Sequence, residues 1–172
     1  MNCPNCESIQ NNAHIIYKDN AAVAQLVEKP AMVGHTIVLP IEHQPIIEKL
    51  SDEIFEDMFV IAIKIAIAGF EALGAHGTNI LINNGLPAGQ TSGHTQINII
   101  PRFEGDGLNV QWNPTKATED DLNDAMLRLN SELMKKEEEP KKEEEKKVEV
   151  QEAEEELADE DNYLLKQLER QP

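Results

Sequence analysis

The sequence is poor in aromatic residues, in positive charge and in long apolar runs. Only 4% of its 172 residues are aromatic, which argues against a surface on which nucleobases stack. The net charge is −17 and no basic patch interrupts it, so the backbone of a nucleic acid would be repelled. We therefore expect no nucleic acid among the partners of this protein.

Segments able to enter a membrane are also missing from the sequence. The most apolar stretch, residues 58–70, contains Lys64 and is shorter than the roughly 20 residues that a bilayer-spanning helix needs. The N-terminus lacks the charged start and apolar run of a secretory signal. We expect a cytoplasmic protein without a membrane partner, whose two cysteines are metal ligands or free thiols rather than a disulfide.

Residues 1–134 have the apolar periodicity of a single folded domain. Four short apolar runs predict strands. They lie at residues 21–27, 36–40, 78–83 and 94–100. Pro101 follows the last run and is expected to end that strand, because proline cannot donate a hydrogen bond to a strand ladder.

A longer apolar segment follows Ser51 and Asp52, either of which can cap a helix. The apolar residues of this helix, Asp52–Leu73, point in more than one direction, so a single small sheet would not cover them. The excess face is either buried within the monomer or a contact between subunits, and both interpretations stay open. Thr118 predicts the cap of a later helix, because acidic residues at 119–121 follow it.

The composition changes at Lys135. Residues 135–161 consist mainly of Glu and Lys blocks, which cannot bury a core, and they predict a disordered or helical linker. In residues 162–172, four apolar side chains between Tyr163 and Leu168 recur at helical spacing. An apolar stripe on a charged tether is typical of a segment that docks onto a protein partner, although it can also fold back onto its own domain.

Polar side chains alternate along the run at residues 94–100. Neighbouring residues of a strand point to opposite faces, so His94, Gln96 and Asn98 share one face and the residues between them share the other. The preceding loop, residues 85–91, contains two glycines and can offer backbone N–H groups to a phosphate. The sequence therefore predicts a row of polar groups beside an anion-binding loop.

Residues 89–102 resemble the signature strand of the histidine triad (HIT) nucleotide hydrolases. That family carries His-x-His-x-His, then two apolar residues and often Pro-Arg, with Gly-Gln-Thr or Gly-Gln-Ser ahead of the first histidine. This sequence matches at Gly89-Gln90-Thr91, at His94 and at Ile99-Ile100-Pro101-Arg102. Residues 30–40, with Pro-x-x-x-Gly-His-x-x-apolar-x-Pro, and Asn83-x-Gly85 are similar to two further segments of the family.

This resemblance extends over residues 1–135 and implies an α+β, HIT-like fold, an antiparallel sheet of about five strands with helices. It also implies a homodimer, which would use the helix Asp52–Leu73, and a pocket for a purine nucleotide or its phosphate. The residues that match this pocket are Asn83, Gly89, Gln90, Thr91, Gln96 and Asn98.

Three positions depart from the family pattern. The middle histidine of the family attacks the α-phosphate, but the matching residue here is Gln96, whose neutral amide is not a nucleophile. The third histidine is replaced by Asn98, which cannot carry a proton near neutral pH. Val27 stands where the family tends to hold the ribose hydroxyls with Asp or Asn. We therefore expect a degenerate triad, His-x-Gln-x-Asn, without a catalytic residue, and His35 of the Gly-His segment is expected to be packed rather than catalytic.

Cys3 and Cys6 form a Cys-x-x-Cys pair, which alone fits a metal site, a redox pair or two unrelated thiols. A subgroup of the HIT family binds structural zinc with such a pair, a histidine after the Gly-His strand and a histidine of the triad. The matching histidines are His43 and His94. The resemblance thus implies structural Zn²⁺ in a closed tetrahedral Cys₂His₂ site, which explains why His94 persists while the other two histidines are gone.

Together these features predict a catalytically degenerate HIT protein. It would bind a nucleotide or phosphate, or act as an adaptor, and recruit a protein partner through its acidic tail. The alternative is an enzyme of the usual family class, acting on AMP-phosphoramidate or diadenosine polyphosphates, in which Gln96 and Asn98 orient a water. A zinc-dependent redox switch at Cys3 and Cys6 is a third hypothesis.

Overall fold

The computed structural model describes residues 3–135, and the chain divides into two compact units after Val110. The first unit consists of a sheet with helices on both of its faces. Its elements are α1 (Pro4–Gln10), β1 (Ile15–Lys18), β2 (Ala22–Leu26), β3 (Thr36–Pro40), η1 (Ile47–Lys49), α2 (Asp52–Leu73), β4 (Gly77–Ile82), η2 (Leu86–Ala88) and β5 (Ile97–Arg102).

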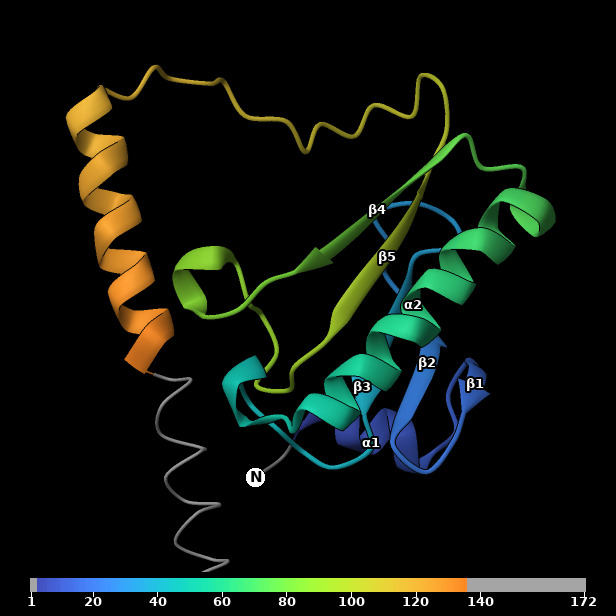
Figure 1. Cartoon of the computed structure of the whole chain (residues 1–172). Helices are drawn as coiled ribbons and strands as arrows, with labels where there is room; N and C mark the ends of the chain where they lie inside the picture. Colours follow the sequence, from blue (N-terminus) through green and yellow to red (C-terminus); the bar gives the residue numbers. More distant parts are fainter. Residues whose placement is uncertain (1–2, 136–172) are drawn as a thin grey trace, which may run out of the picture. The chain divides into compact units, whose positions relative to one another are not determined.

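The sheet is antiparallel throughout, with the strand order β1-β2-β3-β5-β4 (Figure 1). β5 lies between β3 and β4, and Asn98 pairs with Ile37 on one side and with Leu81 on the other. The expected α+β fold with a five-stranded antiparallel sheet is confirmed. The strands predicted at residues 21–27, 36–40 and 78–83 are β2, β3 and β4, each correct to within one residue at either end.

Different helices cover the two faces of the sheet. On one face, α2 packs against strand residues that alternate along β2, β3 and β5. They are Ala22, Ala24, Val38, Ile97 and Ile99. On the other face, Val23, Ile37 and Leu39 pack with Ile9 of α1. Asn98 lies opposite Ile37 in the strand register and therefore faces the α1 side.

The helix α2 begins and ends as its sequence predicts. The Ser51 side chain accepts a hydrogen bond from the backbone N–H of Ile54, and Gly74 ends the helix in the left-handed conformation. An outward stripe of α2 stays between 40% and 56% exposed. It consists of Phe59, Val60, Ile63, Ile67 and Phe70. Within residues 3–135, nothing covers this excess apolar face.

The strand predicted from residue 94 begins later, at Ile97. The backbone N–H of Thr95 donates to the Gln44 carbonyl at 2.7 Å, so the chain before β5 is bound to a loop rather than to a strand. The predicted alternation nevertheless holds, because His94 and Gln96 lie on the same side as Asn98, where they meet α1 and its N-terminal turn.

The prediction that Pro101 ends the strand is wrong, because β5 continues to Arg102. The last pair between β3 and β5 joins Thr36 to Ile99, whereas β4 pairs with β5 as far as Arg102. One side of β5 is therefore unpaired at Pro101, and a residue without an N–H is tolerated there.

The second unit contains a helix over residues 119–135. Thr118 caps it as predicted, because the Thr118 hydroxyl accepts a hydrogen bond from the backbone N–H of Asp121 and donates one to its carboxylate. The acidic residues of the first turn also suit the positive end of the helix dipole.

The tail predictions fall mostly beyond the described part of the chain. Residues 136–161 of the predicted linker and the predicted docking segment, 162–172, lie outside the described residues. The domain end predicted at residue 134 stays a prediction. In the described range, 3–135, no helix combines the length and the hydrophobicity needed to cross a bilayer.

Candidate functional site

Four candidate metal ligands converge, although they come from three separate parts of the sequence. Cys3 and Cys6 lie at the start of α1, His43 follows β3, and His94 precedes β5. Their ligand atoms all lie within 4.8 Å of one another. The fold therefore brings together the four residues that the resemblance implied, and we call them the metal cluster.

The distances within the metal cluster fit a tetrahedral ion. His94 Nδ1 lies 3.7 Å from Cys3 Sγ and 3.5 Å from Cys6 Sγ, while His43 Nδ1 lies 3.3 Å from Cys6 Sγ. Tetrahedral zinc bonds of about 2.3 Å to sulfur and about 2.05 Å to nitrogen place a sulfur and a nitrogen about 3.6 Å apart. The donors thus match a Cys₂His₂ zinc site in chemistry and in spacing.

The orientation of His94 prepares it to be a ligand. Its ring is fully buried, and its Nε2–H donates to the Pro40 carbonyl at 3.0 Å. That hydrogen bond leaves the Nδ1 lone pair directed at the two sulfurs. Burial lowers the pKa of His94, which favours the neutral imidazole that a metal requires. Burial, followed by a hydrogen bond with Cys3, raises the pKa of the Cys6 thiol, so a bound ion must displace its proton.

Gln96 and Asn98, which we call the polar row, lie side by side on the α1 face of the sheet. Gln96 Nε2 donates to Asn98 Oδ1 at 3.2 Å, and Asn98 Nδ2 donates to the Leu81 carbonyl at 3.3 Å. A backbone carbonyl can only accept, so it fixes the orientation of the Asn98 amide and, through it, that of Gln96. Gln96 Oε1 then accepts from Asn5 Nδ2, 3.1 Å away.

His35 contacts the polar row from the residue before β3. Its Nδ1 accepts from the backbone N–H of Ala31 at 3.2 Å, so its proton sits on Nε2, which donates to Asn98 Oδ1 at 3.3 Å. Burial lowers the pKa of His35, against the opposing effect of the Asn98 hydrogen bond. Both ring nitrogens of His35 are therefore engaged in hydrogen bonds within the protein.

Asn83 and Gln90 hold the shape of the loop before the polar row. Asn83 Nδ2 donates to a carbonyl of η2 at 2.8 Å. Gln90 Oε1 accepts from the backbone N–H of Gly85, and Gln90 Nε2 donates to the carbonyls of Pro45 and Ser92. Both amide hydrogens of Gln90 are thus used within the protein, and its contribution to a ligand is the geometry of the loop.

The loop and the polar row enclose a polar pocket of about 160 Å³. All six residues predicted for the nucleotide site line it, together with Ser92. Gly89 has a φ of +82°, and a Cβ there would lie 3.1 Å from Asn83 Nδ2, so the position favours glycine. Within residues 3–135, the backbone N–H groups of Thr91 and Ser92, two residues that line the pocket, donate to no backbone carbonyl. The pocket therefore offers several neutral donors to an anion and no positive charge.

A second pocket of about 240 Å³ lies beside α1. Its lining includes Asn5, which also hydrogen-bonds to Ser92 and Gln96 of the polar pocket, so the two pockets adjoin. Val27 lines the second pocket as well. At the position that the resemblance assigns to ribose recognition, the side chain therefore has no group that can bond to a hydroxyl.

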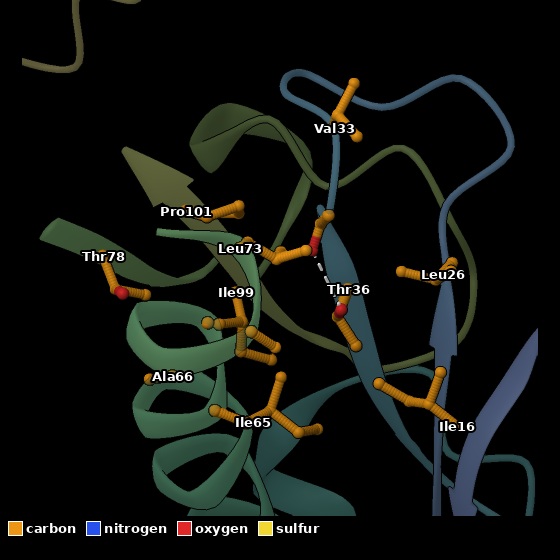
Figure 2. Close-up of a pocket in the computed structure, with 14 residues that line it drawn as sticks. Ile16, Leu26, Val33, Thr36, Ile65, Ala66, Leu73, Thr78, Ile99 and Pro101 are labelled. Carbon is orange, nitrogen blue, oxygen red and sulfur yellow. Dashed lines mark hydrogen bonds between the residues drawn. The ribbon is translucent and has the colours of Figure 1, made fainter. Parts of the chain in front are cut away.

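The α2 side of the sheet holds a pocket of a different kind, about 370 Å³ and lined almost entirely by apolar side chains. Figure 2 shows Ile65 and Leu73 of α2 lining it together with side chains of the sheet. The Thr36 hydroxyl there donates to the Gly34 carbonyl at 3.1 Å, so its polar atom is satisfied internally. This apolar pocket shares no residue with the polar pocket and offers little to a phosphate.

Asn5 and Ser92 were not among the site residues predicted from the sequence. Asn5 Nδ2 donates to Ser92 Oγ at 3.0 Å and to Gln96 Oε1 at 3.1 Å. The sequence did place Asn5 between the two cysteines proposed as metal ligands, and residues beside metal ligands often contact the surroundings of the site. Ser92 carries no comparable signal in the sequence.

Similarity to known proteins identifies the family to which this chain belongs. The model of the HIT domain family matches residues 8–105. The crystal structure of a HIT family member from Bacillus subtilis is similar, with a TM-score of 0.70 and 30% identity, over 76% of this chain and 96% of that chain. A zinc-bound histidine triad family protein from Mycobacterium smegmatis gives a TM-score of 0.60 and 33% identity, over 67% of this chain and 85% of that chain.

A similar sequence is that of the adenylylsulfatase HINT3 of Arabidopsis thaliana. It is 33% identical over 108 residues, which are 62% of this chain and 55% of that protein, so this chain spans about half the length of that relative. The family model matches residues 8–105, and the fold is similar to that of the Bacillus subtilis HIT family member. This chain is therefore a member of the histidine triad (HIT) domain family.

Proposed function

We propose that this chain is a catalytically degenerate HIT protein that binds a nucleotide or phosphate and holds a structural zinc ion. The observation that carries the proposal is that neither histidine next to the polar row has a lone pair free for a ligand. His94 directs its Nδ1 at the cysteine sulfurs. His35 has both ring nitrogens in hydrogen bonds.

Transfer of a nucleotidyl group at this position needs a nucleophile and a group that moves a proton. The amide nitrogen of Gln96 has a delocalised lone pair, and both polar atoms of Gln96 already bond to Asn5 and Asn98. Asn98 cannot exchange a proton near neutral pH. The polar row can thus hold an anion through its N–H groups, and it lacks the groups for the chemical step.

The residues suited to hold Zn²⁺ are Cys3, Cys6, His43 and His94. When bound, the ion supplies a cross-link between α1 and the two segments that carry the histidines, and four protein ligands leave no position for a reactive water. This gives His94 a structural reason to persist. The similarity to a zinc-bound histidine triad family protein from Mycobacterium smegmatis supports zinc as the metal.

The polar pocket suits the phosphate of a purine nucleotide, and the adjoining pocket beside α1 suits its nucleoside. Val27 offers no hydrogen bond to the ribose, whereas the Glu28 carboxylate in the same lining can accept one from a hydroxyl. The affinity should still rest mainly on the phosphate, because the polar pocket supplies N–H donors to it. We expect AMP and GMP to bind the zinc-loaded chain with similar affinity in calorimetric titrations, and adenosine to bind far more weakly. If neither nucleotide binds, the nucleotide part of the proposal is wrong and an adaptor remains.

Two variants of the loop, one that obstructs the pocket and one matched control, sharpen that titration. Gly89→Val places a branched side chain at a positive φ, against Asn83, and should abolish AMP binding. The exposed Leu86 belongs to the same loop but not to the pocket lining, so Leu86→Ala should leave the affinity for AMP unchanged. Equal AMP binding by both variants would place the ligand elsewhere.

We also propose a cytoplasmic homodimer that forms through the outward stripe of α2. Five exposed apolar side chains on one helix support this contact. Sedimentation equilibrium should give a dimer for the wild-type chain and a monomer for Ile63→Lys. A monomeric wild-type chain would contradict the proposal.

A protein partner recruited through residues 162–172 is a further part of the proposed function. It rests on the apolar spacing of that segment in the sequence, which lies outside the described residues. A chain truncated after residue 161 should lose partners that the full chain captures, and identical captured proteins would contradict this part.

A second candidate function is the HIT-type nucleotide hydrolase or phosphoramidase, and the similarity to the adenylylsulfatase HINT3 favours it. Such an enzyme would need Gln96 and Asn98 to orient a water for direct attack. The double variant Gln96→His with Asn98→His separates the two functions. If only the variant acts on adenosine phosphoramidate, the pocket has kept its ligand and lost its chemistry, whereas equal turnover by the wild type favours the hydrolase.

A further inference from the structure

Asn5 connects the metal cluster to the polar row from a position between the two cysteines. Cys3 is the N-cap of α1 and Cys6 lies in its first turn. The cysteine sulfurs approach the histidines, whereas the Asn5 amide reaches Ser92 at 3.0 Å and Gln96 at 3.1 Å. A single helical turn therefore contacts both candidate sites.

The amides of this contact form a hydrogen-bond chain with one direction. Asn98 Nδ2 donates to the Leu81 carbonyl, so Asn98 presents its oxygen to Gln96. Gln96 then donates through Nε2 and accepts through Oε1, and this acceptor faces Asn5. Asn5 uses both of its amide hydrogens, one on Gln96 and one on Ser92. The orientation of each amide thus depends on its neighbour.

This chain decides which atom of Gln96 meets a ligand. Gln96 Nε2 carries two hydrogens, of which one goes to Asn98, and Gln96 lines the polar pocket. The second hydrogen therefore remains for an anion. If Asn5 moves away, Gln96 keeps only its hydrogen bond to Asn98, so its amide is no longer held at both ends and its second N–H loses its fixed position toward an anion. The affinity of the pocket for phosphate thus depends on the position of Asn5.

The position of Asn5 depends in turn on the metal cluster. α1 has only seven residues, and a helix of that length is not stable by itself. Its second half is anchored by buried Ile9 and by the hydrogen bond from Ser8 to Gln25 at 2.8 Å. Its first turn has no side-chain cap, and the side-chain hydrogen bonds and sulfur contacts found for this turn are those of Cys3, Asn5 and Cys6. An ion bound to those cysteines would fix this turn.

We propose that Asn5 is a positioning residue that couples metal occupancy to anion binding in the polar pocket. With the ion bound, Asn5 holds Gln96 Oε1, and Gln96 keeps an N–H for the ligand, a phosphate monoester anion. This inference rests on the proposed function, both for the zinc ion and for the nucleotide. It predicts that removal of the metal weakens phosphate binding, although no metal ligand lines the polar pocket.

Titration of AMP into three forms of the full chain tests the coupling. Relative to the zinc-loaded wild type, the metal-free wild type should bind AMP roughly five- to tenfold more weakly, the equivalent of about one hydrogen bond. Asn5→Ala should show the same loss while retaining its zinc, and removal of that zinc should weaken AMP binding no further. Gln10→Ala, an exposed position at the end of α1, is the matched control and should behave as the wild type.

Two results of these titrations would overturn the proposal. Equal AMP affinity with and without zinc would show that the two sites are independent. A metal dependence that persists undiminished in Asn5→Ala would assign the coupling to another residue. Should the metal-free chain lose its fold, Asn5→Ala decides the matter, because that variant keeps all four metal ligands and therefore the ion.

The side-chain amide signal of Gln96 in ¹⁵N–¹H NMR spectra tests the same inference without AMP. The absence of this signal in Gln96→Ala assigns it. Its chemical shift should change when zinc is removed from the wild type and should stay the same when zinc is removed from Asn5→Ala. Backbone signals of β3 and β5 report whether the fold is intact. A zinc-loaded wild type that does not bind AMP refutes the nucleotide function, whereas a Gln96 amide that does not respond to zinc refutes the coupling.

Discussion

The metal cluster and the polar row meet in one short segment, because His94 belongs to the first and Gln96 to the second. In the cluster, all four side chains can bind an ion, and their donor atoms lie within 4.8 Å of one another. In the row, Gln96 and Asn98 replace two histidines of the family pattern and bond to one another. His94 thus stands where the family resemblance places the first triad histidine, whereas its contacts are with the cysteine sulfurs of the cluster. Under the proposed function, a retained motif residue serves a different site.

The largest expected effect is on the metal side of this comparison. Cys6 Sγ approaches both His43 Nδ1 and His94 Nδ1, so Cys6→Ser should lose the ion. Free zinc at about 100 times its Kd stabilises a fold that binds it by about 2.7 kcal/mol. Calorimetric unfolding in the presence of zinc should therefore show that Cys6→Ser has lost unfolding free energy of that order. Glu7→Ala, an exposed neighbour, is the control. Full metal content in Cys6→Ser would show that Cys6 is not a ligand of the ion.

A smaller loss of unfolding free energy is expected when Gly34, just before β3 of the sheet, is replaced. Gly34 precedes β3 with a φ of +93°, and a Cβ there would clash with the Leu73 side chain and lie 3.2 Å from Pro101 Cγ. Gly34→Ala should cost about 2 kcal/mol of unfolding free energy, measured with urea, without loss of metal. Gly69→Ala on α2, where an added Cβ has open space, should not destabilise the fold. Equal losses in both variants would contradict this account.

A pH-dependent effect is expected after the end of β5. The Arg102 guanidinium forms two hydrogen bonds with the Asp106 carboxylate, at 2.6 and 2.9 Å, and holds the pKa of that carboxyl far below its usual range. A lowered pKa in the folded state stabilises the fold above the unfolded pKa of about 3.9, and this stabilisation is lost as the pH falls below it.

Asp106→Asn should therefore lower stability near neutral pH and flatten the acid limb of the stability profile. The loss should be smaller than for Gly34→Ala, because Arg102 keeps its hydrogen bonds to Asn79 and to the Leu108 carbonyl. Urea midpoints measured across a pH series check this expectation. Parallel profiles for the wild type and the variant would show that the carboxylate has no such role.

The smallest expected effect on stability belongs to the polar row itself. Gln96→Ala removes hydrogen bonds to Asn5 and Asn98 at a half-buried position, so it should cost about 1 kcal/mol or less and leave the metal content unchanged. Thermal unfolding of the zinc-loaded variant measures the loss. A loss as large as that of Cys6→Ser would contradict the view that the cluster, and not the row, stabilises the fold.

Local sequence patterns were sufficient to predict the elements β2, β3, β4 and α2. Apolar runs between turn residues predict the strands, and Ser51 caps the Ile54 N–H as its position suggests. α1 was not predicted, because its seven residues have little periodicity and are held by tertiary contacts such as that of Ser8 with Gln25. The continuation of β5 through Pro101 also depends on where another strand ends.

The candidate site likewise has parts that the sequence predicts and parts that it does not. Cys3 and Cys6 form a visible pair, but His43 and His94 stand 37 and 88 residues beyond Cys6, and only the family resemblance linked them. The hydrogen bond from Asn5 to Gln96 spans 91 residues, and no rule of spacing predicts it. Chemistry that lies within one strand was therefore predictable, whereas contacts between distant segments needed the structure.

Turnover of adenosine phosphoramidate by the zinc-loaded full chain, measured beside that of Gln96→Ala, decides whether the polar row is catalytic. A polar row without a nucleophile or a free imidazole lone pair predicts that both proteins release AMP no faster than the spontaneous reaction. Release of AMP by the wild-type chain that disappears in Gln96→Ala would contradict the claim that this HIT protein is catalytically degenerate.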